Sequence, residues 1–187
     1  MTWQTVLPIT GYTREADLST RVLARLEHWF IIEREVPGQH WSGRQLRIDA
    51  ILRPREPQQW KNPNVALGVE FKRNTPGAYN VALKDATSMA AQAIDYTQTE
   101  WDGFGHISVF TCPGVMQWAG MDGHHADPRE YAAVMYRHLL MQFGVGELVV
   151  KWGYGLTFHL GDQPIWNERQ GVRHGKKWGL KPRVGSR

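Results

Sequence analysis

The chain has 187 residues, of which 42% are hydrophobic and 21% charged, with a formal net charge of +4, as in an ordinary globular domain. No apolar run approaches the roughly 18 residues that a membrane span needs, and the first residues lack the basic-then-apolar pattern of a secretory signal. The single cysteine, Cys112, excludes an internal disulfide and fits a reducing, cytoplasmic compartment. It closes an apolar run, where a buried structural thiol is expected.

The first predicted element is a helix from Thr13 to Phe30, with Leu18, Val22 and Leu26 at helical spacing. The other elements are expected from apolar runs and turn residues. They are strands over 30–36, 47–52 and 65–72, a helix over 82–97, a strand over 106–112, a helix from about 127 to 143, and a hairpin of 147–152 and 155–160. Pro37-Gly38 is expected to stop the first strand, and the Pro-rich residues 53–64 to form an exposed loop. The order predicts a mixed α/β domain over residues 1–162.

Residues 163–187 form a predicted basic tail, with seven Lys or Arg against one acid, whereas the preceding 162 residues hold 15 basic and 17 acidic residues. A basic tail with glycines and Trp166 interleaved suits contacts with a nucleic-acid backbone, although it could merely aid solubility. Further tryptophans fall in predicted loops or in the tail, where an exposed ring can stack on an unpaired base: Trp41, Trp60, Trp101, Trp118 and Trp178.

Charged residues interrupt two of the apolar strands. Asp49 lies within one, and the next carries Glu70 and Lys72. Because residues i and i+2 of a strand point to the same face, Glu70 and Lys72 project together. A carboxylate in an apolar strand costs several kcal/mol unless it is paired or bound to a metal. If the two strands pair, Asp49 joins Glu70 and Lys72.

Two interpretations of this triplet stay open. In one, Asp49, Glu70 and the carbonyl of Phe71 bind Mg²⁺ or Mn²⁺, which prefer oxygen ligands. Lys72 would then help deprotonate an attacking water and stabilise developing negative charge. In the other, Lys72 forms a buried ion pair with Asp49 or Glu70 and no metal is bound.

Residues on two predicted helices bear on this choice. Glu15 is a carboxylate that could reach the same metal, although complementing the helix dipole is an adequate role. Gln92 and Tyr96 are four residues apart and share one helix face, where an amide and a phenol could bind a phosphate, a carboxylate or a water. Alternatively, Tyr96 packs in the core and Gln92 faces solvent.

An early helical Glu, an Asp strand, a Glu-x-Lys strand and a helix with Gln-x-x-x-Tyr together resemble the PD-(D/E)XK nuclease superfamily, over about residues 13–112. The last element is similar to the branch of lambda-type exonucleases and RecB-type nuclease domains. The resemblance implies a restriction-endonuclease-like core, a mixed central sheet flanked by helices. It also implies metal binding by Asp49 and Glu70, catalysis by Lys72, and an accessory pair, Gln92 with Tyr96. Glu15 would match the helical acid, with Glu27 as the fallback. Ile48 stands before the aspartate, at a position where the superfamily often has proline.

Together with the resemblance, these observations predict a metal-dependent deoxyribonuclease that uses Mg²⁺ or Mn²⁺, and they fit DNA processing in a phage or mobile element. The choice between DNA and RNA, and between single strands and duplex ends, stays open. Exonuclease and endonuclease action, and the oligomeric state, stay open. One alternative is a nucleic-acid-binding module of the same fold that has lost turnover. Another is a structural or assembly protein whose basic tail contacts a protein partner.

Overall fold

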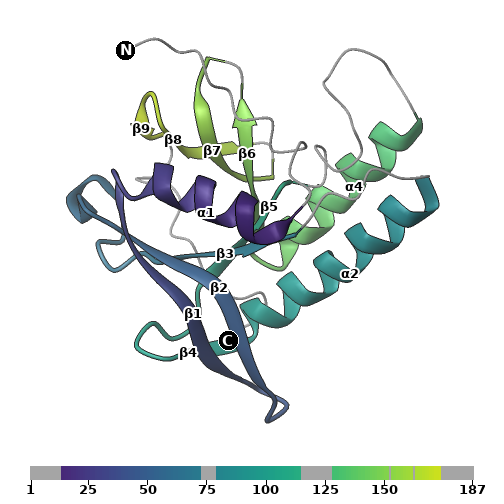
Figure 1. Ribbon diagram of the computed structural model, residues 1–187, viewed down its shortest axis with the longest axis horizontal. Helices are drawn as coiled ribbons and strands as arrows, with labels where there is room; N and C mark the ends of the chain where they lie inside the picture. Colours follow the sequence, from purple (N-terminus) through teal and green to yellow (C-terminus); the bar gives the residue numbers. More distant parts are fainter. Residues whose placement is uncertain (1–13, 73–78, 115–127, 152, 162, 174–187) are drawn as a thin grey trace.

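The computed structural model describes residues 14–72, 79–114, 128–151, 153–161 and 163–173, with side chains of 79–86 and 128–134 left out. These residues form a mixed α/β structure (Figure 1). The helices are α1 (Glu15–Leu26), α2 (Tyr79–Thr97) and α4 (Pro128–Gln142), with a short 3-10 helix η2 (Pro57–Gln59). The strands are β1 (Phe30–His40), β2 (Gln45–Pro54), β3 (Leu67–Phe71), β4 (Thr99–Trp101), β5 (Ser108–Cys112), β6 (Val145–Lys151), β7 (Gly155–Leu160), β8 (Gln163–Asn167) and β9 (Gly171–Val172). None of the described helices is long and apolar enough to cross a membrane.

All of the described strands join one curled sheet, in the order β4-β1-β2-β3-β5-β6-β7-β8-β9 (Figure 1). The pairs β3–β5 and β5–β6 are parallel, and the other neighbours are antiparallel. Helix α1 covers one face, where its apolar side packs against alternate residues of β2 and β3. Helices α2 and α4 cover the other face. The predicted mixed α/β class with helices flanking a sheet is therefore confirmed.

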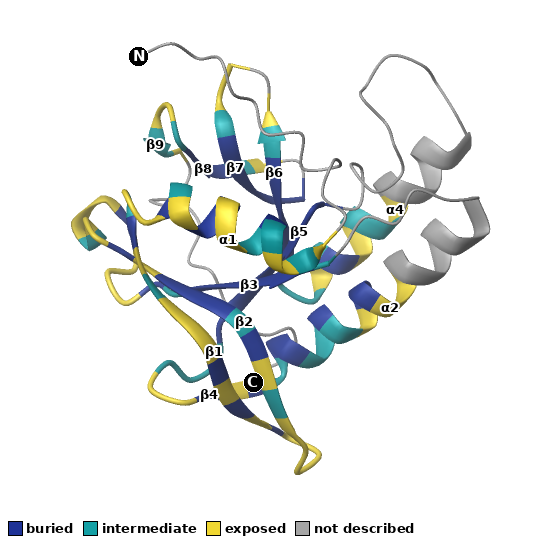
Figure 2. Cartoon of the chain, in the orientation of Figure 1, coloured by how far each residue is buried: buried dark blue, intermediate teal, exposed yellow. Residues whose placement is uncertain are grey.

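The centre of the sheet is its most buried part (Figure 2). Every residue of β3 and of β5 is buried, because these strands have neighbours on both sides and helices on both faces. The side chains of Leu67, Val69 and Phe71 point toward α1. Because successive residues of a strand point to opposite faces, Gly68 and Glu70 lie on the α2 face. A charged residue at such a position needs a local partner.

The first strand is longer than predicted. β1 continues through Pro37 and Gly38, which pair with β2, and Gly38 also pairs with Trp101 of β4. A Cβ on Gly38 would lie 2.6 Å from the Trp101 ring. The glycine thus makes room for a buried tryptophan instead of ending the strand. The expectation that Pro37-Gly38 stops β1 is wrong because a third strand, β4, which the sequence pattern did not predict, packs there.

The predicted tail is also different where it is described. Residues 163–172 add β8 and β9 to the sheet, and Trp166 is buried against Phe30 and Phe158. Residues 174–187 lie outside the described residues. Two tryptophans expected in exposed loops, Trp60 and Trp101, are buried, whereas Trp41 is exposed. Apolar packing therefore accounts for these buried rings, and Trp118 and Trp178 lie outside the described residues.

Candidate functional site

The candidate site lies where β2 and β3 separate. Their pairing runs from Leu52–Leu67 to Ala50–Val69 and goes no further. One residue beyond, the carboxylate Oδ2 of Asp49 accepts a hydrogen bond from the backbone N of Phe71, at 2.7 Å. The Asp49 side chain thus takes the place of a strand partner and is held at the gap between the two strands.

Glu70 and Lys72 project from the end of β3 on the α2 face. The backbone N of Lys72 donates to the carbonyl of Cys112, so the alignment with β5 persists just past the strand. Lys72 Nζ lies 2.8 Å from Glu70 Oε1. The side chain of Glu70 is 3% exposed and that of Lys72 is 29% exposed. The strand spacing therefore produces the expected pair, with the carboxylate buried and the ammonium reaching solvent.

Helix α2 contributes an amide and a phenol to the same group. Gln92 Nε2 donates to Glu70 Oε1 at 2.8 Å and to the Tyr96 hydroxyl at 2.7 Å. The Tyr96 hydroxyl donates in turn to the carbonyl of Arg47 at 2.8 Å. Tyr96 also packs edge-on against Trp101, so it is both a core residue and part of a network. The structure thus brings Glu70, Lys72, Gln92 and Tyr96 into one hydrogen-bonded chain, with Asp49 coupled to it by charge.

Negative charge dominates the electrostatics of the site. Burial, followed by the charge of Asp49, raises the pKa of Glu70 to about 7, although Lys72 opposes this. Burial also raises the pKa of Asp49, against its hydrogen bond from Phe71, and the charge of Glu15 raises it further. Burial disfavours the Lys72 ammonium, but the hydrogen bond and charge of Glu70 outweigh it, so the pKa of Lys72 is raised. Burial and then the charge of Glu70 raise the pKa of Tyr96 to about 12.

Glu15 acts on the site from the first turn of α1. Its charge adds to the pKa shifts of Asp49, Glu70 and Lys72. Among the part of the chain that the structure describes, however, no group of three or more His, Cys, Asp or Glu side chains is arranged to hold a metal ion. The role of Glu15 as a third metal ligand therefore stays a prediction. Glu27, the fallback acid, is exposed and 3.8 Å from Arg34.

Glu35 is a further acid near the site, exposed and paired with Arg47 at 2.7 Å, that the sequence interpretation did not single out. It faces Asp49 between the pairs Arg34–Ala50 and Val36–Ile48, and its φ of 54° is left-handed, which is uncommon outside glycine. Its charge raises the pKa values of Asp49 and Tyr96. The only sequence signal was an acid interrupting a β-rich run, which equally describes a solvent-facing residue.

A second missed feature is a row of buried polar residues that crosses the sheet. Glu70 is in register with Thr111 of β5, Thr111 with Glu147 of β6, and Glu147 with His159 of β7. All four are buried, and their apolar neighbours in sequence face α1, so the row faces α2 and α4. Glu147 lies 3.1 Å from Arg137 of α4. The candidate site is therefore one end of a longer polar row.

Cys112 behaves as predicted for a structural thiol. It is fully buried at the end of β5 and unpaired with another cysteine among the described residues. Burial raises the pKa of its thiol, which keeps the sulfur protonated and unreactive.

Comparisons with known protein families, with characterised proteins and with solved structures found no match for the chain.

Proposed function

We propose that this protein is a metal-dependent nuclease that hydrolyses phosphodiester bonds of DNA. One observation carries the proposal: Glu70 Oε2 is buried and has no hydrogen-bond partner within the described residues. Its other oxygen is already bonded to Lys72 and Gln92, and the neighbouring charge of Asp49 is of the same sign. A buried carboxylate oxygen in this position needs a further partner, either a proton or a cation.

A divalent cation fits this need. Asp49, Glu70 and the carbonyl of Phe71 would supply three hard oxygen ligands, with water completing the shell, as Mg²⁺ and Mn²⁺ prefer. When bound, such an ion would polarise a phosphate oxygen and lower the pKa of a water. Because Asp49 Oδ2 is fixed by the backbone N of Phe71, its carboxylate is already oriented.

Of the remaining residues, Lys72 would neutralise developing negative charge, and Gln92 and Tyr96 would hold Glu70 in position. Lys72 is held beside Glu70 yet partly exposed, so its ammonium can face both the attacking water and the developing charge on phosphate. Gln92 fixes Glu70 Oε1, and Tyr96 fixes Gln92 by tying it to the backbone at Arg47. Gln92 and Tyr96 would therefore act as positioning residues.

The proposal extends to the restriction-endonuclease-like core that the sequence resemblance implies. A mixed sheet with α1 on one face and α2 on the other supports it, as does the meeting of all five expected catalytic residues at one place. An intracellular role in phage or mobile-element DNA processing belongs to the same proposal.

The test is cleavage of linear, circular and single-stranded DNA in the presence of Mg²⁺, Mn²⁺ or EDTA. Lys72→Ala should abolish a cleavage that depends on the metal, while Lys61→Ala, an exposed lysine in the loop before β3, should leave it unchanged. Survival of circular DNA would indicate an exonuclease. Cleavage that resists EDTA, or that persists in Lys72→Ala, would contradict the proposal. Metal-independent DNA binding without cleavage would instead support the alternative of a binding module.

A further inference from the structure

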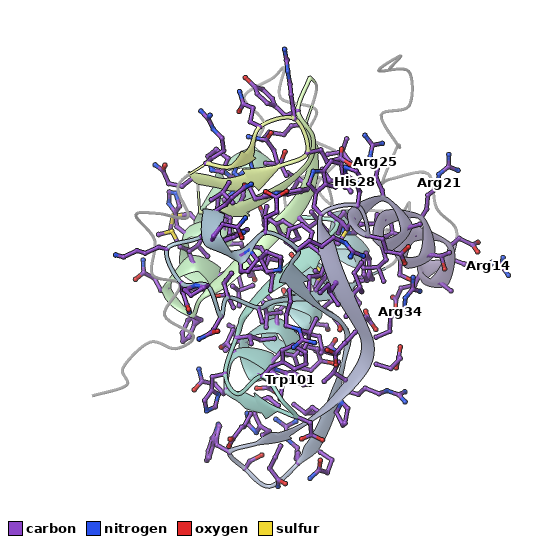
Figure 3. All side chains as sticks on the ribbon, turned by 90° about the vertical axis from the view of Figure 1, so that its left-hand side faces the viewer. Arg14, Arg21, Arg25, His28, Arg34 and Trp101 are labelled. Atoms are coloured by element: carbon purple, nitrogen blue, oxygen red, sulfur yellow. The ribbon has the colours of Figure 1, made fainter. Side chains whose placement is uncertain are left out.

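Basic side chains follow one side of α1 and its flanks. Arg14, Arg21, Arg25 and His28 are separated by seven, four and three residues, which places them in one row along a helix. Figure 3 shows them along α1, with Arg34 on the neighbouring strand β1. We call the four residues from Arg14 to His28 the basic stripe. At about 1.5 Å per residue the stripe is about 21 Å long.

The N-terminal end of the stripe is next in sequence to a residue that acts on the candidate site. Arg14 precedes Glu15, whose charge acts on Asp49, Glu70 and Lys72. The stripe lies beside the apolar side of the helix, which packs on the sheet, and so it is presented to solvent. A partner that contacts the whole stripe would therefore reach the end of α1 that carries Glu15.

The ion pairs within the stripe leave it able to bind an anion. Arg14 pairs with Asp17 at 2.8 Å, but both side chains are exposed, and such a surface pair contributes little to stability. Arg14 can thus exchange Asp17 for a phosphate at little cost. Arg25 is different, because it bonds to the buried carboxylate of Glu168, which fixes its guanidinium toward the His28 end of the stripe.

A row of basic side chains fits a row of anions. Phosphates repeat along a nucleic-acid strand, and arginine is well suited to bind them. An anionic membrane is a poorer fit, since the exposed large hydrophobic side chains among the described residues lie elsewhere than on α1 and an interfacial helix needs an apolar side to insert.

We propose that the basic stripe binds the phosphate backbone of a DNA strand on its way to or from the candidate site. This inference rests on the proposed function for the identity of the partner, and it assigns α1 as the track of the strand. Arg14 and Arg21 would contact phosphates, and the fixed Arg25 would set the position of the strand.

Equilibrium binding of a short labelled DNA strand in EDTA tests the stripe, because cleavage then plays no part. The double variant Arg14→Gln/Arg21→Gln should bind about tenfold more weakly or worse, and the slope of log affinity against log salt should become shallower by about 1.4. The matched control, Arg44→Gln/Arg53→Gln, removes two exposed arginines of the β1–β2 ribbon and should bind like the parent protein.

The outcomes separate this inference from the nuclease. If the parent protein cleaves DNA and the stripe variant binds DNA as well as the parent does, the inference about the stripe is wrong and the proposed nuclease activity is supported. Stripe-dependent binding without any cleavage would support the stripe and contradict the nuclease. Absence of DNA binding, or equal loss in the control variant, would overturn the stripe, as would binding to phosphatidylserine-rich vesicles in its place.

Discussion

Glu70 and Glu147 occupy equivalent positions in the sheet, two strands apart. Both are buried, both face α2 and α4, and Thr111 lies between them in the register. Each also has a cationic partner, at 2.8 Å from Lys72 for Glu70 and at 3.1 Å from Arg137 for Glu147. The two glutamates nevertheless differ in the charges around them and in the exposure of their cationic partners to solvent.

Glu147 is matched by an arginine from a packed helix, and the Arg137 side chain is only 19% exposed. Glu70 shares one lysine with two other acids, Asp49 and Glu15, whose charges raise its pKa. A buried acid with its own cation holds elements together, whereas acids gathered around one exposed lysine attract another cation. We therefore propose a structural role for Glu147 and a chemical one for Glu70.

The sharpest test of this comparison applies one substitution to both positions. Glu70→Gln keeps the shape of the side chain but removes the charge that would hold a cation, so we expect DNA cleavage to fall on the order of 10²-fold or more. Glu147→Gln should cleave at the parent rate once corrected for the folded fraction. The measurement is cleavage rate with Mn²⁺, alongside circular dichroism of both variants. Equal losses of rate would remove the distinction.

The second test removes the cationic partner of each glutamate instead. Arg137→Leu leaves Glu147 buried without its arginine, and we expect a loss of about 3 kcal/mol in the free energy of unfolding. Lys72→Leu should cost less, because Glu70 can take up a proton at its raised pKa, which is about 7. Urea denaturation at neutral pH measures both. A larger loss in Lys72→Leu would show that the Glu70 pair is the structural one.

The sequence alone predicted those features of the site that depend on residue spacing within one strand or helix. Strand alternation places Glu70 and Lys72 on one face, and the i, i+4 spacing brings Gln92 to Tyr96. The apolar runs around Asp49 and Glu70 predicted two strands that do pair. Spacing within one element thus accounts for the pairs Glu70–Lys72 and Gln92–Tyr96, whereas their meeting depends on the docking of α2 on the sheet.

The sequence was insufficient where partners come from distant elements. β1 runs through Gly38 because Trp101 packs on it, and β8 forms because Trp166 fits between Phe30 and Phe158. Neither contact leaves a local signal. The pairing of Glu147 with Arg137, and the approach of Glu35 to Asp49, likewise depend on which strands and helices become neighbours.

A pH series sharpens the electrostatic half of the comparison. The pKa of Glu70 rises from 4.5 to about 7 on folding, so the unfolded chain loses this proton first. Stability from this group is therefore unaffected below about pH 4.5, declines between about pH 4.5 and 7, and stays lower above that, by about 3 kcal/mol in total. In EDTA, the difference in free energy of unfolding between the parent and Glu70→Gln, measured with urea, should show this pH dependence.

Added Mn²⁺ should reverse that penalty above about pH 7, since an ion that binds only the folded state raises stability by about 3 kcal/mol at a hundred times its dissociation constant. Glu70→Gln should gain much less from the ion. A gap that does not change with pH, or equal stabilisation of both proteins, would contradict the assignment of Glu70.

The smallest expected effect concerns the link between Glu70 and the backbone. Tyr96→Phe removes the hydroxyl that accepts from Gln92 and donates to the carbonyl of Arg47, while Gln92 keeps its bond to Glu70. We expect about 1 kcal/mol less stability and cleavage about tenfold slower, with the loss in kcat and little change in KM, because a positioning residue orients Glu70 without touching DNA. Tyr154→Phe, at an exposed turn, is the matched control. If Tyr96→Phe lost stability yet kept its full kcat, the α2 network would serve the fold alone, and Glu70 would then resemble Glu147 more closely than its charges imply.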